Sequence, residues 1–425
     1  MPENTLEFEV AVVGAGPAGL AAACTAAESG RRVALLDETP WLGGQIWRGQ
    51  AARPSLAAAR SWFERFNRCG ATRISGAAVI AFPGPGMLLA ETAGGSIQVK
   101  WKRLVLATGE RELFLPFPGW TLPGLIGPGG LQTLIKNGWP VAGLTVVVAG
   151  TGPLLLVVAE SLRKQGARVR VIAEQAGRKQ INRFGLALAA YPAKLWQAAN
   201  LRLRLLGVPY QRGVWPARAD GEDSIRQVSL TDGSRTWSEP CDLLACGFGL
   251  VPNVELALAL GCKLNDGFVA VDERQATTVP SIFCAGEPTG IAGADCAGVE
   301  GQIAGYVAAD ENEKAEALFA RRVAWHKFRA LLAEAFALRP ELKTLATDDT
   351  LLCRCEDVTF GQVKQHGSWR EAKLQSRCGM GACQGRICGA ASKALLGWPM
   401  ESVRPPVLPA RVESLISTNN ITPNP

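Results

Sequence analysis

The stretch from Val10 to Gly44 constrains this chain more than any other, because it follows the whole pattern of a nucleotide-binding βαβ unit. A short apolar strand ends at Val13, and glycines follow in GxGxxG spacing at Gly14, Gly16 and Gly19. The first glycine allows the tight turn, the second lets a pyrophosphate approach the backbone, and the third brings the helix close to the strand.

The helix and the second strand complete the pattern. A helix from Pro17 to about Ser29 would point free N–H groups at the phosphates, with Pro17 and Ala18 in its first turn. A strand over Val33–Leu36 leads to Asp37 and Glu38, where a carboxylate can accept hydrogen bonds from a ribose. We therefore predict a dinucleotide site; the alternative is a Rossmann-type unit that holds no nucleotide.

Composition limits the class of protein. A chain of 425 residues, 48% of them hydrophobic, can form roughly three packed domains. The net charge of +7 comes from 45 basic and 38 acidic residues, without the basic block of a nucleic-acid-binding protein. We expect no nucleic-acid partner.

The chain is expected to be cytoplasmic, with any attachment to the inner membrane made through a complex. Its N-terminal sequence, MPENTLEFEV, lacks the basic and apolar regions of a secretory signal. Residues 137–160 carry no charge before Glu160 and are long enough to cross a bilayer. However, prolines and glycines divide them into a strand, a turn and a helix, so we predict no transmembrane segment.

Three further segments bear on the nucleotide site. The loop GGQIWRG (Gly43–Gly49) should lie over the nucleotide, ATG follows a strand that ends near Ala107, and IFCAGE ends at Glu287. The last two resemble the flavoproteins that include the pyridine nucleotide-disulfide reductases, in which an aspartate at the position of Glu287 contacts the flavin ribityl chain. The loop and this resemblance imply these further FAD contacts: Gly44, Gln45, Arg48, Ala107, Thr108, Gly109, Gly286 and Glu287.

A second Rossmann-like pattern lies between these halves. A strand leads to Gly150 and Gly152, a leucine-rich helix follows, and Glu174 ends the next strand. Leu155 replaces the third glycine, which puts NAD(H) binding in doubt and leaves a structural role or an adenine nucleotide as alternatives. Glu174 disfavours a 2′-phosphate, whereas Arg178 and its neighbour Lys179 keep NADP open.

We predict an α/β fold in which a Rossmann-like FAD domain contains an inserted NAD-type domain and is followed by a small helical 2Fe-2S domain. His326 and His366 lie at no ligand spacing from a cysteine or carboxylate cluster, so we interpret them as structural. No catalytic residue can be assigned. The predicted segments are 1–125 and 256–310 (FAD domain), 126–255 (inserted domain), 311–349 (helical linker), 350–405 (2Fe-2S domain) and 406–425 (a disordered tail).

Five of the twelve cysteines crowd into the stretch from Cys353 to Cys388. Thiolates from two tight loops suit zinc or an iron-sulfur cluster, and the short CxC spacing with flanking glycines favours the cluster. TLLCRCEDVTFGQV and KLQSRCGMGACQGRICG resemble the bacterioferritin-associated ferredoxin-like 2Fe-2S domain fused to flavoproteins. Cys378 lies outside the ligand pattern that this resemblance implies, which is Cys353, Cys355, Cys383 and Cys388.

Over nearly its whole length, the chain resembles the flavoprotein alpha-type subunits of heteromeric amine dehydrogenases, a family that includes opine oxidase, D-hydroxyproline dehydrogenase and hydrogen cyanide synthase. The resemblance implies an FAD-dependent oxidoreductase acting on CH–NH bonds. Its partners would be a glycine/D-amino-acid oxidase-like FAD beta subunit, a small ferredoxin-like subunit, and a quinone or other electron acceptor. The alternatives are a self-sufficient NAD(P)H-dependent reductase and a non-catalytic, nucleotide-binding assembly subunit.

Overall fold

The structure is a computed structural model that describes residues 5–49, 57–398 and 403–416, and the chain divides into two compact units. Both units are built from separate segments of the chain. Unit 1 contains Met1–Arg111, Pro252–Arg329 and Glu401–Pro425, and unit 2 contains Glu112–Val251 and Ala330–Met400.

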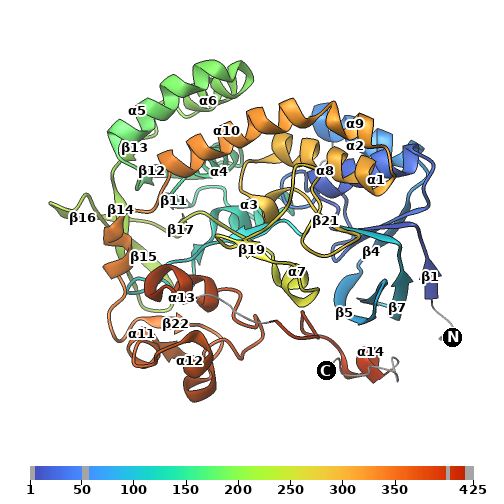
Figure 1. Ribbon diagram of the computed structural model, residues 1–425. Helices are drawn as coiled ribbons and strands as arrows, with labels where there is room; N and C mark the ends of the chain where they lie inside the picture. Colours follow the sequence, from blue (N-terminus) through green and yellow to red (C-terminus); the bar gives the residue numbers. More distant parts are fainter. Residues whose placement is uncertain (1–4, 50–56, 399–402, 417–425) are drawn as a thin grey trace. The chain divides into compact units, whose positions relative to one another are not determined.

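Unit 1 is organised by a five-stranded parallel sheet with the order β21-β8-β2-β3-β4. Its two edge strands, β21 and β4, are labelled in Figure 1. Its central strand aligns Val10 with both Val33 and Arg103, so the carboxyl ends of the central strands meet at one edge. The sheet strands are β2 (Val10–Val13), β3 (Val33–Asp37), β4 (Thr72–Ser75), β8 (Arg103–Leu106) and β21 (Ile282–Cys284).

A second sheet and a set of helices complete unit 1. The second sheet has the order β1-β7-β6-β5. Its strands are β1 (Thr5–Glu7), β5 (Ala78–Gly84), β6 (Met87–Thr92) and β7 (Gly95–Lys100). Three elements, β9 (Glu110–Glu112), β18 (Leu250–Pro252) and α10 (Phe319–Ala335), each cross the boundary between the units. The remaining elements of unit 1 are α1 (Pro17–Glu28), α2 (Ala57–Arg68), α7 (Glu255–Ala259), β19 (Leu264–Asn265), β20 (Phe268–Val269), η2 (Glu287–Thr289), α8 (Ala294–Ala308), α9 (Asn312–Glu316) and α14 (Val412–Ile416).

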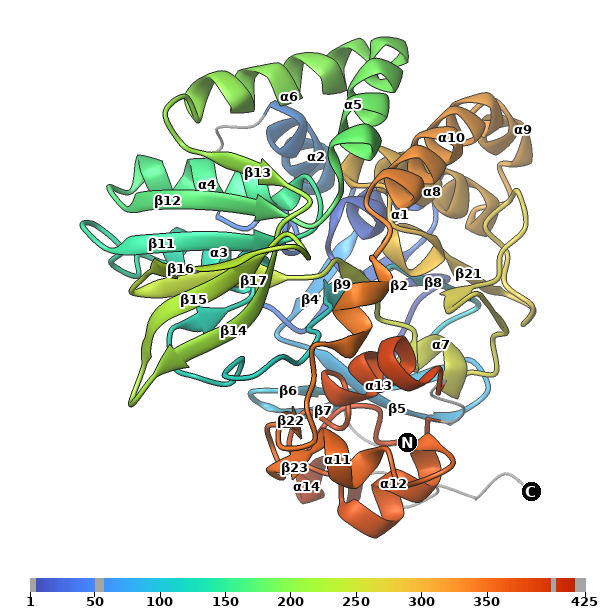
Figure 2. The same cartoon turned by 90° about the vertical axis from the view of Figure 1, so that its left-hand side faces the viewer.

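Unit 2 contains a second five-stranded parallel sheet, ordered β10-β17-β11-β12-β13, and an antiparallel sheet β14-β15-β16 (Figure 2). The parallel strands are β10 (Leu125–Ile126), β11 (Thr145–Gly150), β12 (Arg168–Glu174), β13 (Tyr210–Arg212) and β17 (Leu243–Gly247). The antiparallel strands are β14 (Trp215–Gly221), β15 (Ile225–Thr231) and β16 (Thr236–Pro240).

The helices of unit 2 fall into two groups. The sheet domain carries α3 (Pro128–Lys136), α4 (Leu154–Lys164), α5 (Arg178–Ala187), η1 (Leu188–Ala190) and α6 (Pro192–Arg204). The later segment contains η3 (Pro340–Thr344), β22 (Leu351–Cys353), β23 (Val358–Thr359), α11 (Phe360–Val363), α12 (Trp369–Ser376) and α13 (Cys388–Leu396). Two Rossmann-like sheets and a helical, cysteine-containing region confirm the predicted fold class.

Glycines of α8 allow a close contact between helices α1 and α8 of unit 1. A Cβ added to Gly301 would lie 2.1 Å from the carbonyl oxygen of Ala18, and one added to Gly305 would lie 2.5 Å from that of Ala22. Only glycine fits at these positions without moving a helix. The alanine-rich sequence of α1 therefore serves backbone packing and leaves its N-terminus at the sheet edge.

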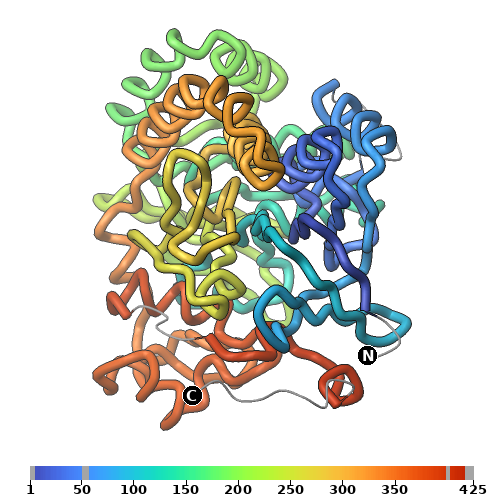
Figure 3. Tube along the Cα trace, turned by 45° about the vertical axis from the view of Figure 1, so that its right-hand side comes forward, coloured from blue at the N-terminus to red at the C-terminus, as the bar shows by residue number. Residues whose placement is uncertain are grey.

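One boundary prediction is wrong. The chain from about Pro406 is expected from its sequence to be disordered, but Val407 is buried and donates its N–H to the carbonyl oxygen of Ile80 at 2.8 Å. The C-terminal segment is drawn in red in Figure 3. Leu408 and Leu415 pack against β5 and β6, because the apolar residues of this segment cover an otherwise open patch of sheet. Residues 417–425 lie outside the described residues.

The uncharged stretch at residues 137–160 divides as predicted into β11, a glycine turn and α4. Within the parts of the chain that the structure describes, no helix has both the length and the apolar character that a bilayer crossing requires.

The α1–α8 contact gives a testable prediction. Gly301→Ala should lower the free energy of unfolding by about 1–3 kcal/mol, because a methyl group would overpack the helix contact. Gly298→Ala in the same helix is the matched control, since a Cβ there meets nothing within 4 Å. Urea unfolding followed by circular dichroism measures both, and equal stability of the two variants would contradict the packing argument.

Candidate functional site

The glycine turn after β2 is fixed by backbone contacts. Gly14 has φ +105°, and a Cβ there would lie 2.1 Å from the carbonyl oxygen of Ala107. A Cβ on Gly19 would lie 1.7 Å from the carbonyl oxygen of Gly14, so α1 rests directly on the turn. In contrast, a Cβ on Gly16 would meet nothing within 4 Å. The turn is closed on its protein side and open at Gly16.

The start of α1 fits an anion. Gly16 is the N-cap, Pro17 stands at the first helical position, no side chain caps the helix, and its first turn has no acidic residue. Gly44 lies against the open side of the turn, where its Cβ would be 2.9 Å from the Cα of Gly16. Backbone N–H groups of a helix N-terminus attract phosphate, so Ala18 and Gly19 begin a suitable cradle for a pyrophosphate.

The two acidic residues after β3 differ in their contacts. The Asp37 carboxylate accepts hydrogen bonds from the Ala15 N–H at 2.6 Å and from the Thr39 N–H and hydroxyl at 2.8 and 2.6 Å. It therefore fixes the turn. Glu38 is exposed and contacts none of the described residues by a hydrogen bond or ion pair. Of the two, Glu38 is the carboxylate free to accept from a ribose.

The loop after β3 contains a buried hydrogen-bond donor that has no acceptor among the described residues. Gln45 is exposed, whereas Arg48 is partly buried. The Nε of Arg48 is shielded from solvent and has no hydrogen-bond acceptor among the described residues. A buried donor without an acceptor is costly, so a bound group with acceptor atoms fits here.

The ATG segment (residues 107–109) is fixed by hydrogen bonds to Asn253. The Thr108 hydroxyl donates to the carbonyl oxygen of Asn253 at 2.6 Å, and the Asn253 side chain donates to the carbonyl oxygen of Thr108 at 2.9 Å. The Asn253 N–H donates to the carbonyl oxygen of Gly109 at 2.9 Å. Ala107 contacts the glycine turn through its carbonyl oxygen, so the segment lies beside that turn.

Glu287 turns back onto the N-terminus of α8. Its carboxylate accepts the N–H groups of Ala292 and Gly293 at 2.9 and 2.8 Å. Burial, together with the negative charge of Glu110, raises the pKa of Glu287 to about 8. The extra methylene of glutamate therefore reaches backbone donors of its own loop.

Behind Glu287, α8 and α10 bring together three residues that sequence reasoning did not connect. Glu300 is 1% exposed and accepts hydrogen bonds from the Gly286 N–H at 2.9 Å and the Thr289 hydroxyl at 2.8 Å. Its other oxygen lies 2.8 Å from His326 Nε2 and 3.6 Å from Cys296 Sγ. The sequence shows no cysteine or carboxylate cluster at ligand spacing from His326, but helix packing brings its ring to Glu300. The interpretation of His326 as a surface or structural residue stays a prediction.

In the inserted domain, the second glycine turn is occupied by the chain itself. Glu174 is 1% exposed, and its carboxylate accepts the Gly152 N–H at 2.8 Å, the Ala176 N–H at 2.9 Å and the Thr151 hydroxyl at 3.2 Å. Burial raises the pKa of Glu174 to about 7. Leu155 is buried in the core between sheet and helices. The donors that would receive a nucleotide are already bonded to this acid.

The segment Phe336–Arg339, here named the sealing segment, covers the same turn. The Thr151 hydroxyl lies 3.4 Å from the carbonyl oxygen of Phe336, and the Gln175 side chain donates to the carbonyl oxygen of Ala337 at 3.1 Å. Gln175 also donates to the Thr151 hydroxyl at 2.9 Å. These contacts engage the Gly152 N–H and the Thr151 hydroxyl within the chain, whereas a Cβ on Gly152 would meet nothing within 4 Å. NAD(H) binding at Gly150, Gly152 and Glu174 stays a prediction.

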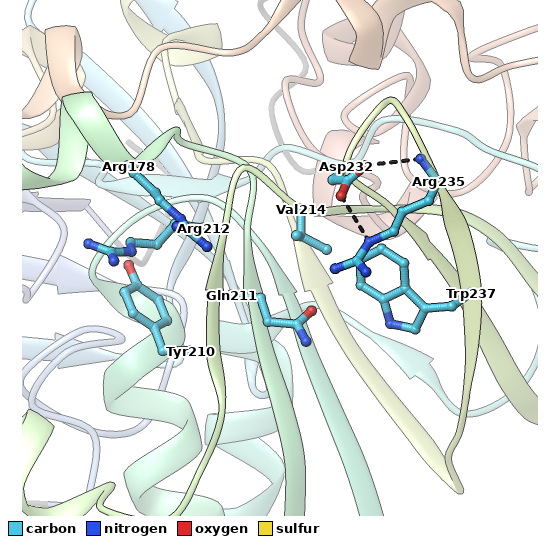
Figure 4. Close-up of a pocket in the computed structure, with 8 residues that line it drawn as sticks. All are labelled: Arg178, Tyr210, Gln211, Arg212, Val214, Asp232, Arg235 and Trp237. Carbon is cyan, nitrogen blue, oxygen red and sulfur yellow. Dashed lines mark hydrogen bonds and ion pairs between the residues drawn. The ribbon is translucent and has the colours of Figure 1, made fainter.

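Beside this turn, unit 2 has a basic pocket of about 260 Å³ (Figure 4). Arg178 and Arg212 lie on one side, and Arg212 donates to the Asn182 side chain at 2.8 Å. On the other side, Arg235 pairs with Asp232 and stacks over Trp237. The lining favours an anion, but the pocket lacks the glycine turn of a dinucleotide site.

The C-terminal cysteines surround a pocket of about 210 Å³, also lined by Phe114, Trp120, Arg354 and Ile387. Four cysteines line it: Cys353, Cys355, Cys383 and Cys388. Cys378 is fully buried behind it, although its sulfur lies within 4.8 Å of those of Cys353 and Cys388. The four predicted ligands therefore line one pocket, whereas the three sulfurs that lie within 4.8 Å of one another are those of Cys353, Cys378 and Cys388. The ligand set stays a prediction.

Backbone N–H groups are directed at three of these sulfurs. Cys353 accepts N–H groups from Gly379, Glu356 and Cys355, and Cys355 accepts one from Cys383. Burial opposes ionisation of Cys383, but N–H groups of Ile387, Gly385 and Arg386 and the thiol of Cys355 lower its pKa. The loop is tight, since a Cβ on Gly381 would lie 2.3 Å from that of Cys355. Burial nevertheless raises the pKa of Cys353, and the thiol of Cys378 raises that of Cys388, so the N–H donors offset only part of the cost of ionisation. The donors fit a metal cluster, whose ligands are thiolates.

Comparisons with known proteins agree with this geometry. The family model of pyridine nucleotide-disulphide oxidoreductases matches residues 8–309. The chain belongs to this family. It is accordingly an FAD-dependent oxidoreductase, and the glycine turn of unit 1 is the part of the match that fits the dinucleotide of FAD.

Two curated relatives cover most of the chain. Hydrogen cyanide synthase subunit HcnB of Pseudomonas aeruginosa is 31% identical, over 89% of this chain and 90% of the relative. An opine oxidase subunit of Agrobacterium tumefaciens is 28% identical, over 96% and 91%. Among solved structures, L-proline dehydrogenase from P. horikoshii has a similar fold, with a TM-score of 0.69, 20% identity, and coverage of 97% of this chain and 80% of that chain.

The occupied turn of the inserted domain gives a pH prediction. The pKa of Glu174 is raised from 4.5 to about 7 on folding, so its contribution to stability is present below pH 4.5 and is lost as the pH rises through 7. In the unchanged protein, the free energy of unfolding should therefore fall by roughly 1–3 kcal/mol across this range. Glu174→Gln has no titrating group at this position and should not show that fall. Thermal unfolding between these pH values measures it, with exposed Glu222→Gln as control. An unchanged pH profile in Glu174→Gln would disprove the assignment.

Proposed function

We propose that this chain is the FAD- and 2Fe-2S-containing subunit of a heteromeric amine dehydrogenase, and that it relays electrons from substrate oxidation on a partner flavoprotein subunit. The observation that carries the proposal is the pocket lined by four cysteine thiols in a chain that also has an FAD-type glycine turn. A flavin accepts two electrons together, whereas a 2Fe-2S cluster passes them singly.

In this proposal, unit 1 holds FAD by backbone groups. The turn at Gly14, Gly16 and Gly19 and the start of α1 at Pro17 and Ala18 cradle the pyrophosphate, because Gly16 leaves space and the helix supplies donors. Glu38 accepts from the adenosine ribose, since Asp37 is engaged by the turn. The remaining proposed contacts are Gly44, Gln45, Arg48, Ala107, Thr108, Gly109, Gly286 and Glu287.

The cluster would be held by Cys353, Cys355, Cys383 and Cys388. Cys355 is exposed and Cys383 partly exposed, whereas Cys353 and Cys388 are each 1% exposed. The bound group would thus have one side towards solvent or a partner protein and the other against Trp120 and the protein interior. Such an edge suits electron exchange with another subunit.

The substrate class follows from the relatives, which are subunits of an opine oxidase and of hydrogen cyanide synthase. We propose that an opine, D-hydroxyproline or a similar amino or imino acid is oxidised on a glycine/D-amino-acid oxidase-like FAD beta subunit. The complex would be completed by a quinone or other acceptor and by a small ferredoxin-like subunit. The reductase alternative is disfavoured because Glu174 and the sealing segment occupy the second nucleotide turn.

The ligand set can be tested by two cysteine variants. Cys355→Ser should lower bound iron by at least about tenfold while FAD content stays unchanged, because the lost ligand belongs to unit 2 and the glycine turn to unit 1. Cys378→Ala is the matched control and should keep its iron, since Cys378 does not line the pocket. Iron analysis and flavin absorbance of anaerobically purified chain measure both. Iron loss in Cys378→Ala with retention in Cys355→Ser would overturn the assignment.

The relay role predicts how the chain responds to NADH. Added to the anaerobic chain alone, NADH should leave the flavin absorbance oxidised, because the donors at Gly152 are bonded to Glu174. Dithionite, which needs no binding site, is the control and should reduce flavin and cluster. Prompt bleaching by NADH would instead identify the chain as a self-sufficient reductase.

A further inference from the structure

The helical hairpin formed by α5 and α6 is exposed to an unusual degree. It leaves the sheet of unit 2 after β12 and returns to it at β13 (Figures 1 and 2). No residue of either helix is buried. Large apolar side chains on it are mostly exposed: Leu186 by 79%, Trp196 by 71%, Leu203 by 64% and Leu206 by 69%.

Four exposed apolar residues of α6 form a stripe. Pro192, Trp196, Ala199 and Leu203 follow one another at steps of four, three and four residues. This is the spacing that places side chains on one face of a helix. Leu206 is exposed in the turn after the helix. The other side of the helix approaches the domain, where Arg204 pairs with Glu160 of α4 at 2.9 Å. The stripe therefore faces away from the protein core.

The charge around this stripe has one sign. From Gln175 to Ala219 the sequence contains no aspartate or glutamate and eight basic residues, namely Arg178, Lys179, Arg183, Lys194, Arg202, Arg204, Arg212 and Arg218. The neighbouring helix α4 adds Arg163 and Lys164, and Arg163 donates to the carbonyl oxygens of Arg204 and Leu206. Within the described residues, Glu160 pairs with Arg204 and Glu334 pairs with Arg183 of the hairpin.

We infer that the α5–α6 hairpin docks this chain onto an anionic lipid surface. An exposed stripe with a tryptophan, set among lysines and arginines without acidic residues, is the composition of a helix that lies in a membrane interface. Trp196 and Leu203 would enter the boundary between headgroups and acyl chains, while the basic residues contact the headgroups. The core of a protein–protein interface is instead depleted of charge.

This inference does not depend on the proposed electron relay, because it concerns a surface separate from the glycine turn and the cysteines. It goes beyond attachment through a complex, since the chain itself would contact the membrane. A chain that relays electrons towards a quinone would gain a short path to a lipid-soluble acceptor. Failure of lipid binding would leave the cysteine and flavin assignments untouched.

Vesicle co-sedimentation with the purified full chain tests the inference. Vesicles of phosphatidylcholine with phosphatidylglycerol should bind the chain at least about tenfold more tightly than vesicles of phosphatidylcholine alone, and added salt should weaken binding. The double variant Trp196→Ser/Leu203→Ser should lose this binding, and Arg178→Gln/Lys179→Gln should weaken it. Leu374→Ser on α12 is the matched control, because Leu374 is 61% exposed outside the hairpin.

A depth measurement separates membrane docking from simple charge attraction. Brominated acyl chains should quench tryptophan fluorescence of the bound chain, and Trp196→Phe should reduce that quenching while binding persists. Equal binding to neutral and anionic vesicles, or binding unaffected by the hairpin variants, would overturn the inference. A concentration-dependent dimer that Leu203→Ser abolishes, without lipid binding, would replace the membrane with a second copy of the chain.

Discussion

The close backbone contact between Gly14 and Ala107 is the constraint on which unit 1 depends. It brings the turn after β2 against the end of β8, and Gly19 then allows α1 to rest on that turn. The glycines of α8, including Gly301, let the second helix close over α1. A larger side chain at any of these places would separate strand, turn and helix. Their combined effect is to present Gly16 and the helix N-terminus at the sheet edge.

Local sequence patterns were enough to predict most of this arrangement. The glycine spacing predicted the turn, because Gly14 and Gly19 are needed where backbone approaches backbone and Gly16 leaves the turn open. The short spacing between Cys353 and Cys355 and between Cys383 and Cys388 also predicted thiols that face a common pocket. Cys378 could be set aside only by resemblance, since its spacing alone does not distinguish a pocket-lining sulfur from a buried one.

Features that depend on distant segments escaped prediction. Glu174 has the expected position for a ribose ligand, but its carboxylate turns inward to the Gly152 N–H. The contact of His326 with Glu300 joins two helices, and nothing in their separate sequences indicates it. The buried position of Val407 depends on apolar strands more than 300 residues earlier in the chain. Such contacts arise from packing, which periodicity and spacing do not encode.

The sealing segment also bears on how this chain can be divided. It is the stretch that leads from α10 to the cysteine region, and Leu342 just beyond it is fully buried in the core of unit 2. The segment that leads into the cysteine region thus packs against the sheet domain and is not a flexible linker. Cutting the chain before Phe336 would uncover Thr151 and Gln175 and remove core side chains from the sheet domain. A recombinant protein, natural or designed, would therefore have to carry the inserted sheet domain and the cysteine region together.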